Sequence, residues 1–321
     1  MFKRILKLLI SKKIRNDLRV WLQTIKDKRI LNKQISYKYH WFKKEFITQN
    51  FKYELVLSKR DRRSCRVIEK KQQPKIDLIY EKFQNQNYDF FIDLGTNYGE
   101  FSIPMSSIVN KVISIEPHPE VYRTFLETKK KFKNIDSFQN GFFDRITKID
   151  LFKDNVKSGG SFVEGAKEDL DGFRKISVLK YLQGYTSDLN NKYRDIIEIE
   201  TINFEFLNKI YNFSNKKIIV KIDVEGFDLQ FMSYLTNCFL DLDLAPKFFI
   251  MAEIGSNYKS KKSINKLSEF INFCLKKNLN IFDLKNKTIR NNEKNLDKIY
   301  NIEDYISSEN FFESGELIVS N

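Results

Sequence analysis

Three charged side chains alternate along an otherwise apolar run, and they are the residues best suited to chemistry in this sequence. The run IIVKIDVEGFDLQFM covers residues 218–232 and carries Lys221, Asp223 and Glu225 before Gly226. In a strand, this period-two spacing places all three side chains on one face. Buried carboxylates are costly unless they are paired, liganded or used. The run predicts a strand that ends in a functional site, with a structural ion-pair network as the alternative.

Carboxylates at the end of a parallel strand can support several reactions. Ligands of open α/β sheets lie outside the carboxyl ends of the strands, so Asp223 and Glu225 are expected to face that crevice. There they could take a proton from a substrate hydroxyl, bind neighbouring hydroxyls or hold a divalent cation, and Lys221 could pair with one of them. Glu253, near the end of the apolar run FFIMAEIG, is either a second substrate-side acid or a hydrogen-bonded strand terminus.

A second motif joins a strand to a glycine turn and then to a helix. In DFFIDLGTNYGEF, Gly95 and Gly99 allow the backbone to approach a ligand closely, and the following helix N-terminus favours an anionic group. The spacing is neither GxGxxG nor a phosphate-binding P-loop. Asp93 precedes the turn and is placed to hold a cationic amine. A ligand with a carboxylate and an ammonium group, such as the methionine part of S-adenosylmethionine (SAM), fits this arrangement; a plain βα turn is the alternative.

Acidic and polar residues follow at the ends of the next two predicted strands. Glu116 ends VISIEP, at about the distance from Asp93 where doubly wound folds place an acid on ribose hydroxyls. Asn140 and Asp144, in SFQNGFFD, would then lie beside the adenine, although an ordinary polar turn explains them nearly as well. Together these positions predict a nucleoside-containing cofactor.

The remaining pattern supplies the elements that must position these residues. From about residue 76, short apolar runs alternate with amphipathic segments, which predicts an α/β doubly wound, mostly parallel sheet. Strands are expected at 88–95, 111–117, 135–144, 147–153, 216–226, 247–255, 280–284 and 316–320, and helices at 100–109, 120–132, 227–235 and 263–278. Residues 154–200 are polar and contain glycine, so they predict a loop or lid insertion.

Composition separates an N-terminal extension from the domain at 76–321. The chain of 321 residues has a net charge of +14, and residues 1–45 carry 14 lysines and arginines against three acids. Residues 1–50 show helical periodicity and residues 51–75 read as a basic linker, so 1–75 is predicted to be a basic helical extension. It could contact an anionic membrane, bind nucleic acid or pack on the domain.

Other classes of protein fit poorly. Three dispersed cysteines and two histidines argue against a zinc site or a disulfide scaffold and favour a reduced, cytoplasmic setting. No run reaches the length of a membrane span, and the N-terminus lacks a secretory signal, so contact with a membrane would be peripheral.

The motifs, taken in order, resemble the FkbM family of SAM-dependent methyltransferases. FIDLGTNYGEFS, VISIEPHPEVYRTFL, FQNGFFD, SGGSF, KIIVKIDVEGFDLQFM and FIMAEIG carry the resemblance over about residues 76–255. It implies a seven-strand Rossmann-like sheet with an antiparallel last strand, and methyl transfer to a hydroxyl of a sugar, glycan, lipid-linked saccharide or small natural product. It also implies that Asp93, Gly95, Asn97, Gly99 and Glu116 bind the cofactor, while Asp223 and Glu225 face the acceptor. Asn203 stands where the family often has an acid.

Two rival functions remain open at this stage. The first is a nucleic-acid methyltransferase, which is disfavoured because the motifs for base methylation are missing, although ribose methylation is not excluded. The second is a non-catalytic methyltransferase fold that binds a membrane surface or a partner, against which the intact cofactor motifs argue. A catalytic metal, held by Asp223 and Glu225, also remains open.

Overall fold

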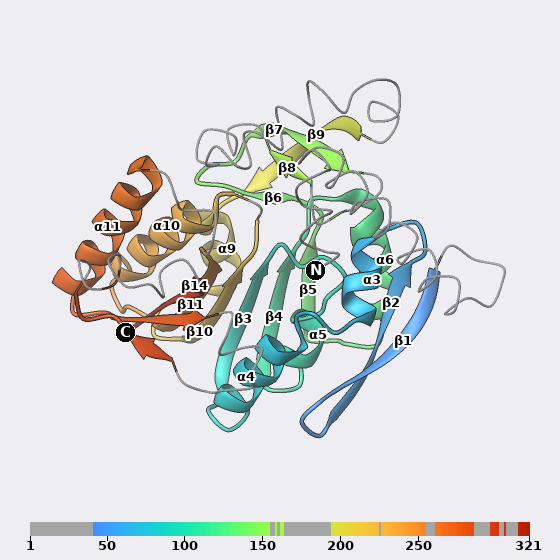
Figure 1. Ribbon diagram of the computed structural model, residues 1–321, viewed down its shortest axis with the longest axis horizontal. Coiled ribbons are helices and arrows are strands. Elements are labelled where there is room, and N and C mark those ends of the chain that lie inside the picture. The colour runs from blue at the N-terminus through green and yellow to red at the C-terminus, as the bar shows by residue number, and fades with distance from the viewer. Residues whose placement is uncertain are drawn as a thin grey trace, which may run out of the picture.

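A mostly parallel β-sheet runs through the computed structural model of the protein (Figure 1). The structure describes residues 41–154, 158, 161–163, 194–224, 226–254, 261–285, 296–301, 305 and 314–321. Within them, the central sheet has the strand order β13-β12-β14-β11-β10-β3-β4-β5. These strands are β3 (Tyr88–Leu94), β4 (Val109–Ile115), β5 (Ile135–Phe138), β10 (Lys217–Ile222), β11 (Lys247–Glu253), β12 (Asn280–Lys285), β13 (Asp297–Lys298) and β14 (Ser314–Ser320).

The strand directions confirm the predicted doubly wound fold. Strands β5, β4, β3, β10 and β11 pair in parallel, whereas β14 is antiparallel to both β11 and β12. The short β13 adds an eighth strand at the edge beside β12. Strands β3 and β10 are buried over nearly their whole length, as expected for parallel strands covered on both faces.

Helices cover both faces of the sheet (Figure 1). One layer contains α9 (Phe204–Tyr211), α10 (Asp228–Leu240) and α11 (Lys261–Lys276); the other contains α4 (Gln73–Phe83), α5 (Ser102–Met105) and α6 (Pro119–Lys129). Along β3, Phe90, Ile92 and Leu94 pack with the first layer, while Phe91 packs with the second. The alternation puts Asp93 on the same face as α4 and α5, which fixes where the site lies.

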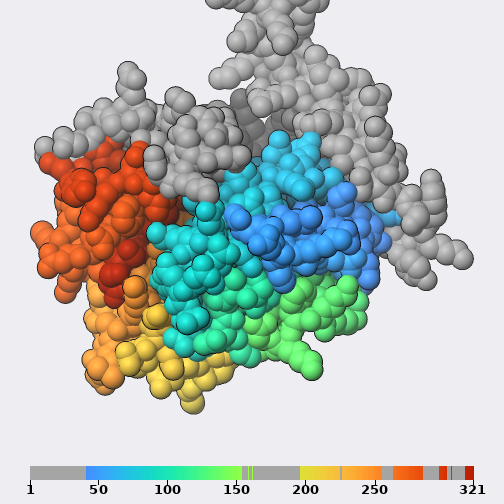
Figure 2. Space-filling view, turned by 90° about the horizontal axis from the view of Figure 1, so that it is seen from below, coloured from blue at the N-terminus to red at the C-terminus, as the bar shows by residue number. Residues whose placement is uncertain are grey.

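The N-terminal part differs from the sequence prediction. A β-hairpin of β1 (Trp41–Thr48) and β2 (Phe51–Ser58) and the helix α3 (Arg63–Ile68) stand where a helix and a linker were expected. The reason is a period-two pattern, hidden among lysines, that turns Phe46 and Thr48 of β1 inward. Figure 2 shows the hairpin (blue) packed beside α4 (teal). Residues 1–40 lie outside the described residues, so their helicity and membrane contact stay predictions, as does the domain boundary at 75.

The predicted loop at 154–200 is also partly wrong. Strands β6 (Gly141–Phe142), β7 (Lys148–Asp154), β8 (Phe162–Val163) and β9 (Arg194–Ile202) form a second sheet in the order β6-β9-β7-β8. Strand β9 covers 194–200 because Ile197, Ile199 and Thr201 turn inward while the intervening residues face solvent. Figure 1 shows this sheet above the ends of β3 and β4. The rest of the predicted loop, 155–157, 159–160 and 164–193, lies outside the described residues.

Across the described part of the chain, no helix is both long enough and apolar enough to cross a membrane.

The hairpin is tied to the domain by a buried hydrogen bond that can be tested. The backbone N–H of Val56 donates to the hydroxyl of Thr128 in α6 at 2.8 Å. In Thr128→Val this N–H loses its acceptor, which should lower the free energy of unfolding by about 1–3 kcal/mol in urea denaturation.

Thr124→Val is the matched control for this change. The Thr124 hydroxyl donates within α6, to the carbonyl of Glu120, so its removal leaves no buried N–H without an acceptor. We expect a loss below about 1 kcal/mol. Equal losses in the two variants would contradict the role given to the Val56 bond.

Candidate functional site

Adjacent strands bring charged residues together at the carboxyl end of the sheet. Lys221 of β10 lies in register with Asp93 of β3 on one side and with Met251 of β11 on the other. On β11, Glu253 lies in register with Glu316 of β14. These side chains share the face covered by α4 and α5, because each lies an even number of residues from a core residue of that face.

Lys221 is the buried centre of this cluster. Its ammonium donates to the carbonyl of Gly95 at 3.0 Å and lies 3.4 Å from Asp93 and 3.5 Å from Asp223. Burial lowers the pKa of Lys221, but the carboxylates of Asp223 and Asp93 outweigh it and raise the pKa above its usual value. Lys221 therefore stays charged and joins the ends of β3 and β10.

The sequence assigned Asp93 to a ligand's amine, but the structure gives its carboxylate other partners. The side chain is 0% exposed, and it accepts a hydrogen bond from the hydroxyl of Ser102 at 2.6 Å besides facing Lys221. With no surface open to solvent, Asp93 stabilises the lysine and the start of α5, and its contact with the cofactor's amine stays a prediction.

Asp223 is an acid of the cluster that remains partly accessible. Its side chain is 26% exposed, and its backbone N–H continues the sheet by donating to the carbonyl of Leu94. Burial raises the pKa of Asp223, but Lys221, Arg63 and Lys75 outweigh it and hold the pKa below its usual range. The group is therefore an ionised hydrogen-bond acceptor at neutral pH.

Asp228, at the start of α10, holds the turn that follows β10. Its two carboxylate oxygens accept hydrogen bonds from the backbone N–H groups of Val224 and Gly226, at 3.1 and 3.0 Å. Burial, with a smaller contribution from Asp223, raises the pKa of Asp228 to about 8. Glu225, one of the predicted catalytic acids, lies between these two bonds but outside the described residues.

The glycine turn between β3 and α5 has the backbone that its sequence predicts. Gly95 and Gly99 have φ of +82° and +86°, and Asn97 between them has φ of +52°. A Cβ on Gly95 would lie 2.0 Å from the carbonyl oxygen of Asp223, so the turn and β10 approach too closely for any side chain there.

Glu116, at the end of β4, is bonded to this turn. Its carboxylate accepts the backbone N–H groups of Asn97 at 2.7 Å and of His118 at 2.9 Å. The residue is 6% exposed, and burial raises its pKa to about 7 despite these two bonds. The predicted cofactor residues Asn97 and Glu116 are therefore in direct contact.

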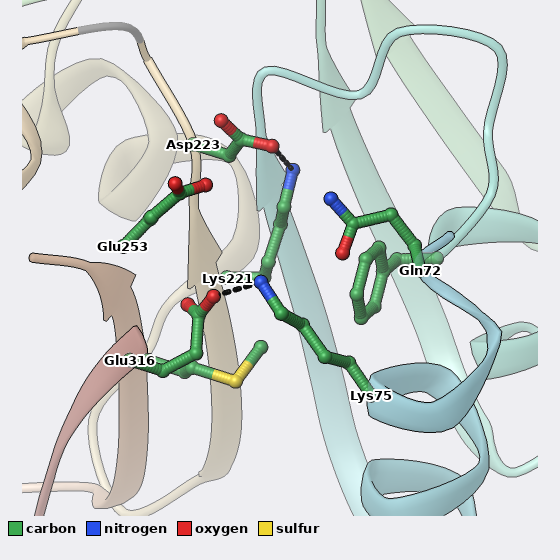
Figure 3. A pocket seen from close by; sticks show the side chains of 8 residues that line it. Gln72, Lys75, Lys221, Asp223, Glu253 and Glu316 are labelled. Carbon is green, nitrogen blue, oxygen red and sulfur yellow. Dashed lines mark hydrogen bonds and ion pairs between the residues drawn. The ribbon is translucent and has the colours of Figure 1, made fainter. Parts of the chain in front are cut away.

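A small hollow of about 10 Å³, with room for about one water molecule, adjoins the cluster (Figure 3). It is lined by Gln72, Lys75, Phe101, Lys221, Asp223, Met251, Glu253 and Glu316. Lys75 of α4 forms an ion pair with Glu316, and burial, with Glu253 adding to it, raises the pKa of Glu316 to about 7 although Lys75 opposes this. Glu253 lies between Asp223 and Glu316, so three acids face two lysines across the hollow.

Other predicted residues have structural partners. Asn140 donates to the carbonyl of Glu200 in β9 at 3.2 Å, and Asp144 is exposed with an ion pair to Arg145 at 3.7 Å. Their contact with adenine stays a prediction. Asn203, where the family often has an acid, caps α9 by accepting the N–H of Phe206 at 3.0 Å, a role that Asn and Asp fill equally well.

Sequence reasoning missed Lys75, Glu316 and Ser102. Lys75 and Glu316 are 241 residues apart, and each reads alone as an ordinary surface charge. Period two places Glu316 on the same face as Ile318, which is the one signal that could have indicated it.

The described residues contain no group of three or more His, Cys, Asp or Glu side chains arranged to hold a metal ion. Because Glu225 lies outside them, the metal site predicted at Asp223 and Glu225 stays a prediction.

These features define a Rossmann-like, SAM-dependent methyltransferase. The model of the methyltransferase FkbM domain matches residues 93–274, more than half of the chain, and the chain belongs to that family. SAM is therefore the cofactor.

Solved structures are only distantly similar. A Streptococcus mutans protein described as a methyltransferase and solved with SAH has 9% identity and a TM-score of 0.37, over 75% of this chain and 95% of its own. The methyltransferase FkbM of Methylobacillus flagellatus has 9% identity and a TM-score of 0.33, over 93% of this chain and 59% of its own. No curated protein matches the sequence significantly.

The close approach at Gly95 can be tested by adding a single methyl group. In Gly95→Ala, the Cβ meets the Asp223 carbonyl in a left-handed backbone, so β3 and β10 must separate. We expect a loss of more than about 2 kcal/mol in urea unfolding, from strain of about 1–3 kcal/mol and the added clash.

Gly141→Ala is the matched control, because its Cβ would meet only side-chain atoms, the nearest at 3.2 Å. A loss below about 1 kcal/mol is expected there. If Gly95→Ala were no more costly than Gly141→Ala, the close approach would not be a real constraint.

Proposed function

We propose that the protein is an O-methyltransferase that transfers the methyl group of SAM to a hydroxyl of a sugar, glycan, lipid-linked saccharide or small hydroxylated acceptor. The observation that carries the proposal is the bond between the Asn97 backbone and Glu116, which ties the glycine turn to the end of β4 beside Lys221 and Asp223. The cofactor and the acceptor would then meet at the ends of β3 and β10.

The residues present fit a bound SAM. Glu116 uses two of about four acceptor positions on its carboxylate, leaving others for ribose hydroxyls. When bound, SAM would supply an electrophilic methyl group. Glu116 would orient the ribose, and Lys221 would fix the Gly95 carbonyl and hence the turn.

Asp223 is suited to orienting the acceptor hydroxyl. Its low pKa makes it a weak base toward a free alcohol, so we assign it the hydrogen bond that aligns the oxygen for in-line attack. The hydroxyl becomes strongly acidic only as its oxygen gains the methyl group, and a carboxylate of low pKa can then take the proton.

The charges of the hollow support a saccharide over a nucleic acid. Carboxylates accept hydrogen bonds from the hydroxyls of a saccharide, and lysines donate hydrogen bonds to them. Phosphates would meet the carboxylates of Asp223, Glu253 and Glu316, which repel them. RNA therefore serves as the rival acceptor in the test.

The first experiment is calorimetry of SAM binding at pH 8 and pH 6. Ionised Glu116 accepts ribose hydroxyls more strongly than the protonated acid does, and its pKa of about 7 means that it gains a proton between pH 8 and pH 6. Affinity should rise with pH and level off above about 7.5, with a Kd roughly tenfold higher at pH 6 than at pH 8.

The same measurements on Glu116→Gln separate this effect from titration of SAM itself, because the variant should lose the Glu116 contribution. A wild-type Kd as pH-dependent as that of Glu116→Gln would remove Glu116 from the cofactor site. No SAM binding by folded wild type at either pH would overturn the proposed function and favour the non-catalytic alternative.

The second experiment removes the charge of Asp223. With radiolabelled SAM and a panel of monosaccharides, oligosaccharides and lipid-linked saccharides, Asp223→Asn should transfer methyl groups about 10²–10⁴ times more slowly than wild type. Its Kd for SAM should stay within a few-fold of the wild-type value, because Lys221 keeps Asp93 as a partner.

Asp89→Asn is the control, since Asp89 lies at the opposite end of β3 and accepts the N–H of Lys217. It should retain wild-type rates. Undiminished transfer by Asp223→Asn would exclude the role given to Asp223, and transfer to RNA in place of saccharides would exclude the acceptor class.

A further inference from the structure

Asp61 lies in the segment SKRDRRSCR, which reads as a linker in the sequence, yet it is 7% exposed and its carboxylate accepts three hydrogen bonds. One carboxylate oxygen accepts the hydroxyl of Tyr98 at 2.7 Å. The other accepts the backbone N–H groups of Arg63 at 2.8 Å and of Ser158 at 3.0 Å. The carboxylate therefore joins three parts of the chain that are far apart in sequence.

Two of these bonds lead to the glycine turn. Tyr98 is part of the turn, immediately before Gly99. Ser158 accepts a hydrogen bond from the side-chain amide of Asn97 at 3.3 Å, so Asp61 reaches the turn by a second route. Two consecutive turn residues, 97 and 98, are thereby fixed from one carboxylate.

The neighbouring Arg63 holds the other side of Gly99. Its guanidinium donates to the carboxylate of Glu100 at 2.7 Å, and both side chains are nearly buried. Behind the turn, a Cβ on Gly99 would lie 2.6 Å from the ring of Phe125. The turn is thus clamped between α6 and the segment around Asp61, with one polar anchor on each side of Gly99.

We propose that Asp61 is a positioning residue for SAM binding, which holds the Gly95–Gly99 turn in its binding shape through Tyr98 and Ser158. The inference rests on the proposed function only in taking this turn as the cofactor site. Asp61 lies before the segment that matches the family model, residues 93–274, so the N-terminal segment supplies a part of the site that the matched segment lacks.

Positioning and mere stabilisation have different consequences. If Asp61 only stabilised the fold, its loss would lower the unfolding temperature and leave the affinity of the folded protein unchanged. If it positions the turn, affinity must fall as well, because the apparent Kd rises in proportion as the fraction of folded protein with the turn in its binding shape falls.

The test is calorimetry with SAM on the full chain carrying Tyr98→Phe or Asp61→Asn, with thermal unfolding measured in parallel. Tyr98→Phe removes one hydroxyl and leaves the ring in the core. We expect a Kd at least about tenfold higher than that of wild type for both variants. The double variant should be little worse than Asp61→Asn alone, because both changes remove the charged bond from the Tyr98 hydroxyl to the Asp61 carboxylate.

Tyr80→Phe is the matched control. Tyr80 is also buried, and its hydroxyl is hydrogen-bonded to that of Ser107 at 3.0 Å, with no bond to the turn. It should lose stability comparable to that lost by Tyr98→Phe and keep the wild-type Kd. Wild-type affinity in folded Tyr98→Phe, or an equal loss in Tyr80→Phe, would overturn the proposal.

Amide hydrogen exchange of residues 95–100 without ligand keeps this test separate from the proposed function. Exchange should be faster in Tyr98→Phe and Asp61→Asn than in wild type, and unchanged in Tyr80→Phe. If wild type bound no SAM, the proposed function and the positioning role would both be wrong. Faster exchange in the variants would still show that the bonds from Asp61 hold the turn in place. If wild type bound SAM and exchange did not change, only the clamp would be wrong.

Discussion

The candidate site depends on one buried ammonium group, that of Lys221. It compensates two carboxylates, Asp93 and Asp223, that would otherwise be costly at the ends of neighbouring strands, and it donates to the carbonyl of Gly95. The same contact brings the glycine turn so close to β10 that no Cβ fits on Gly95. Charge compensation and the shape of the turn are therefore one constraint, and neither can change without the other.

Two further buried ion pairs join the N-terminal elements to this centre. Arg63 of α3 binds Glu100 just after the turn, and Lys75 of α4 binds Glu316 at the edge of the hollow. Both cations come from the region before β3, and both help to hold the pKa of Asp223 low. Buried ion pairs of this kind contribute little net stability, since desolvation opposes them, but they fix the register of the groups they join. The region before β3 thus forms part of the site wall.

The local part of this arrangement could be predicted from the sequence, and little of the rest could. Period-two spacing predicted that Lys221 and Asp223 share a face, the two glycines predicted the turn, and the end of the next strand predicted the position of Glu116, because these signals lie within one strand or one βαβ unit. Asp61, Lys75 and Glu316 depend on contacts between distant segments, which no local pattern encodes. The hairpin was mistaken for helix and linker because lysines occupy its exposed positions, and β9 was missed inside a polar stretch although Ile197, Ile199 and Thr201 alternate.

The burial of Asp93 explains how the carboxylate of Asp223 can face the hollow in its ionised form. A single lysine paired with a single acid would leave no net charge, and the acid would be held by the lysine alone. Here two acids share one ammonium, and the completely buried Asp93 also takes the Ser102 hydroxyl. Asp93 remains in place beside Lys221 beneath the turn. The ammonium therefore keeps a carboxylate partner even when Asp223 is hydrogen-bonded to another group. Asp223 can therefore turn an ionised oxygen toward the hollow without leaving an unpaired ammonium behind it. In this arrangement the buried acid is what leaves the oxygen of its neighbour available to the hollow.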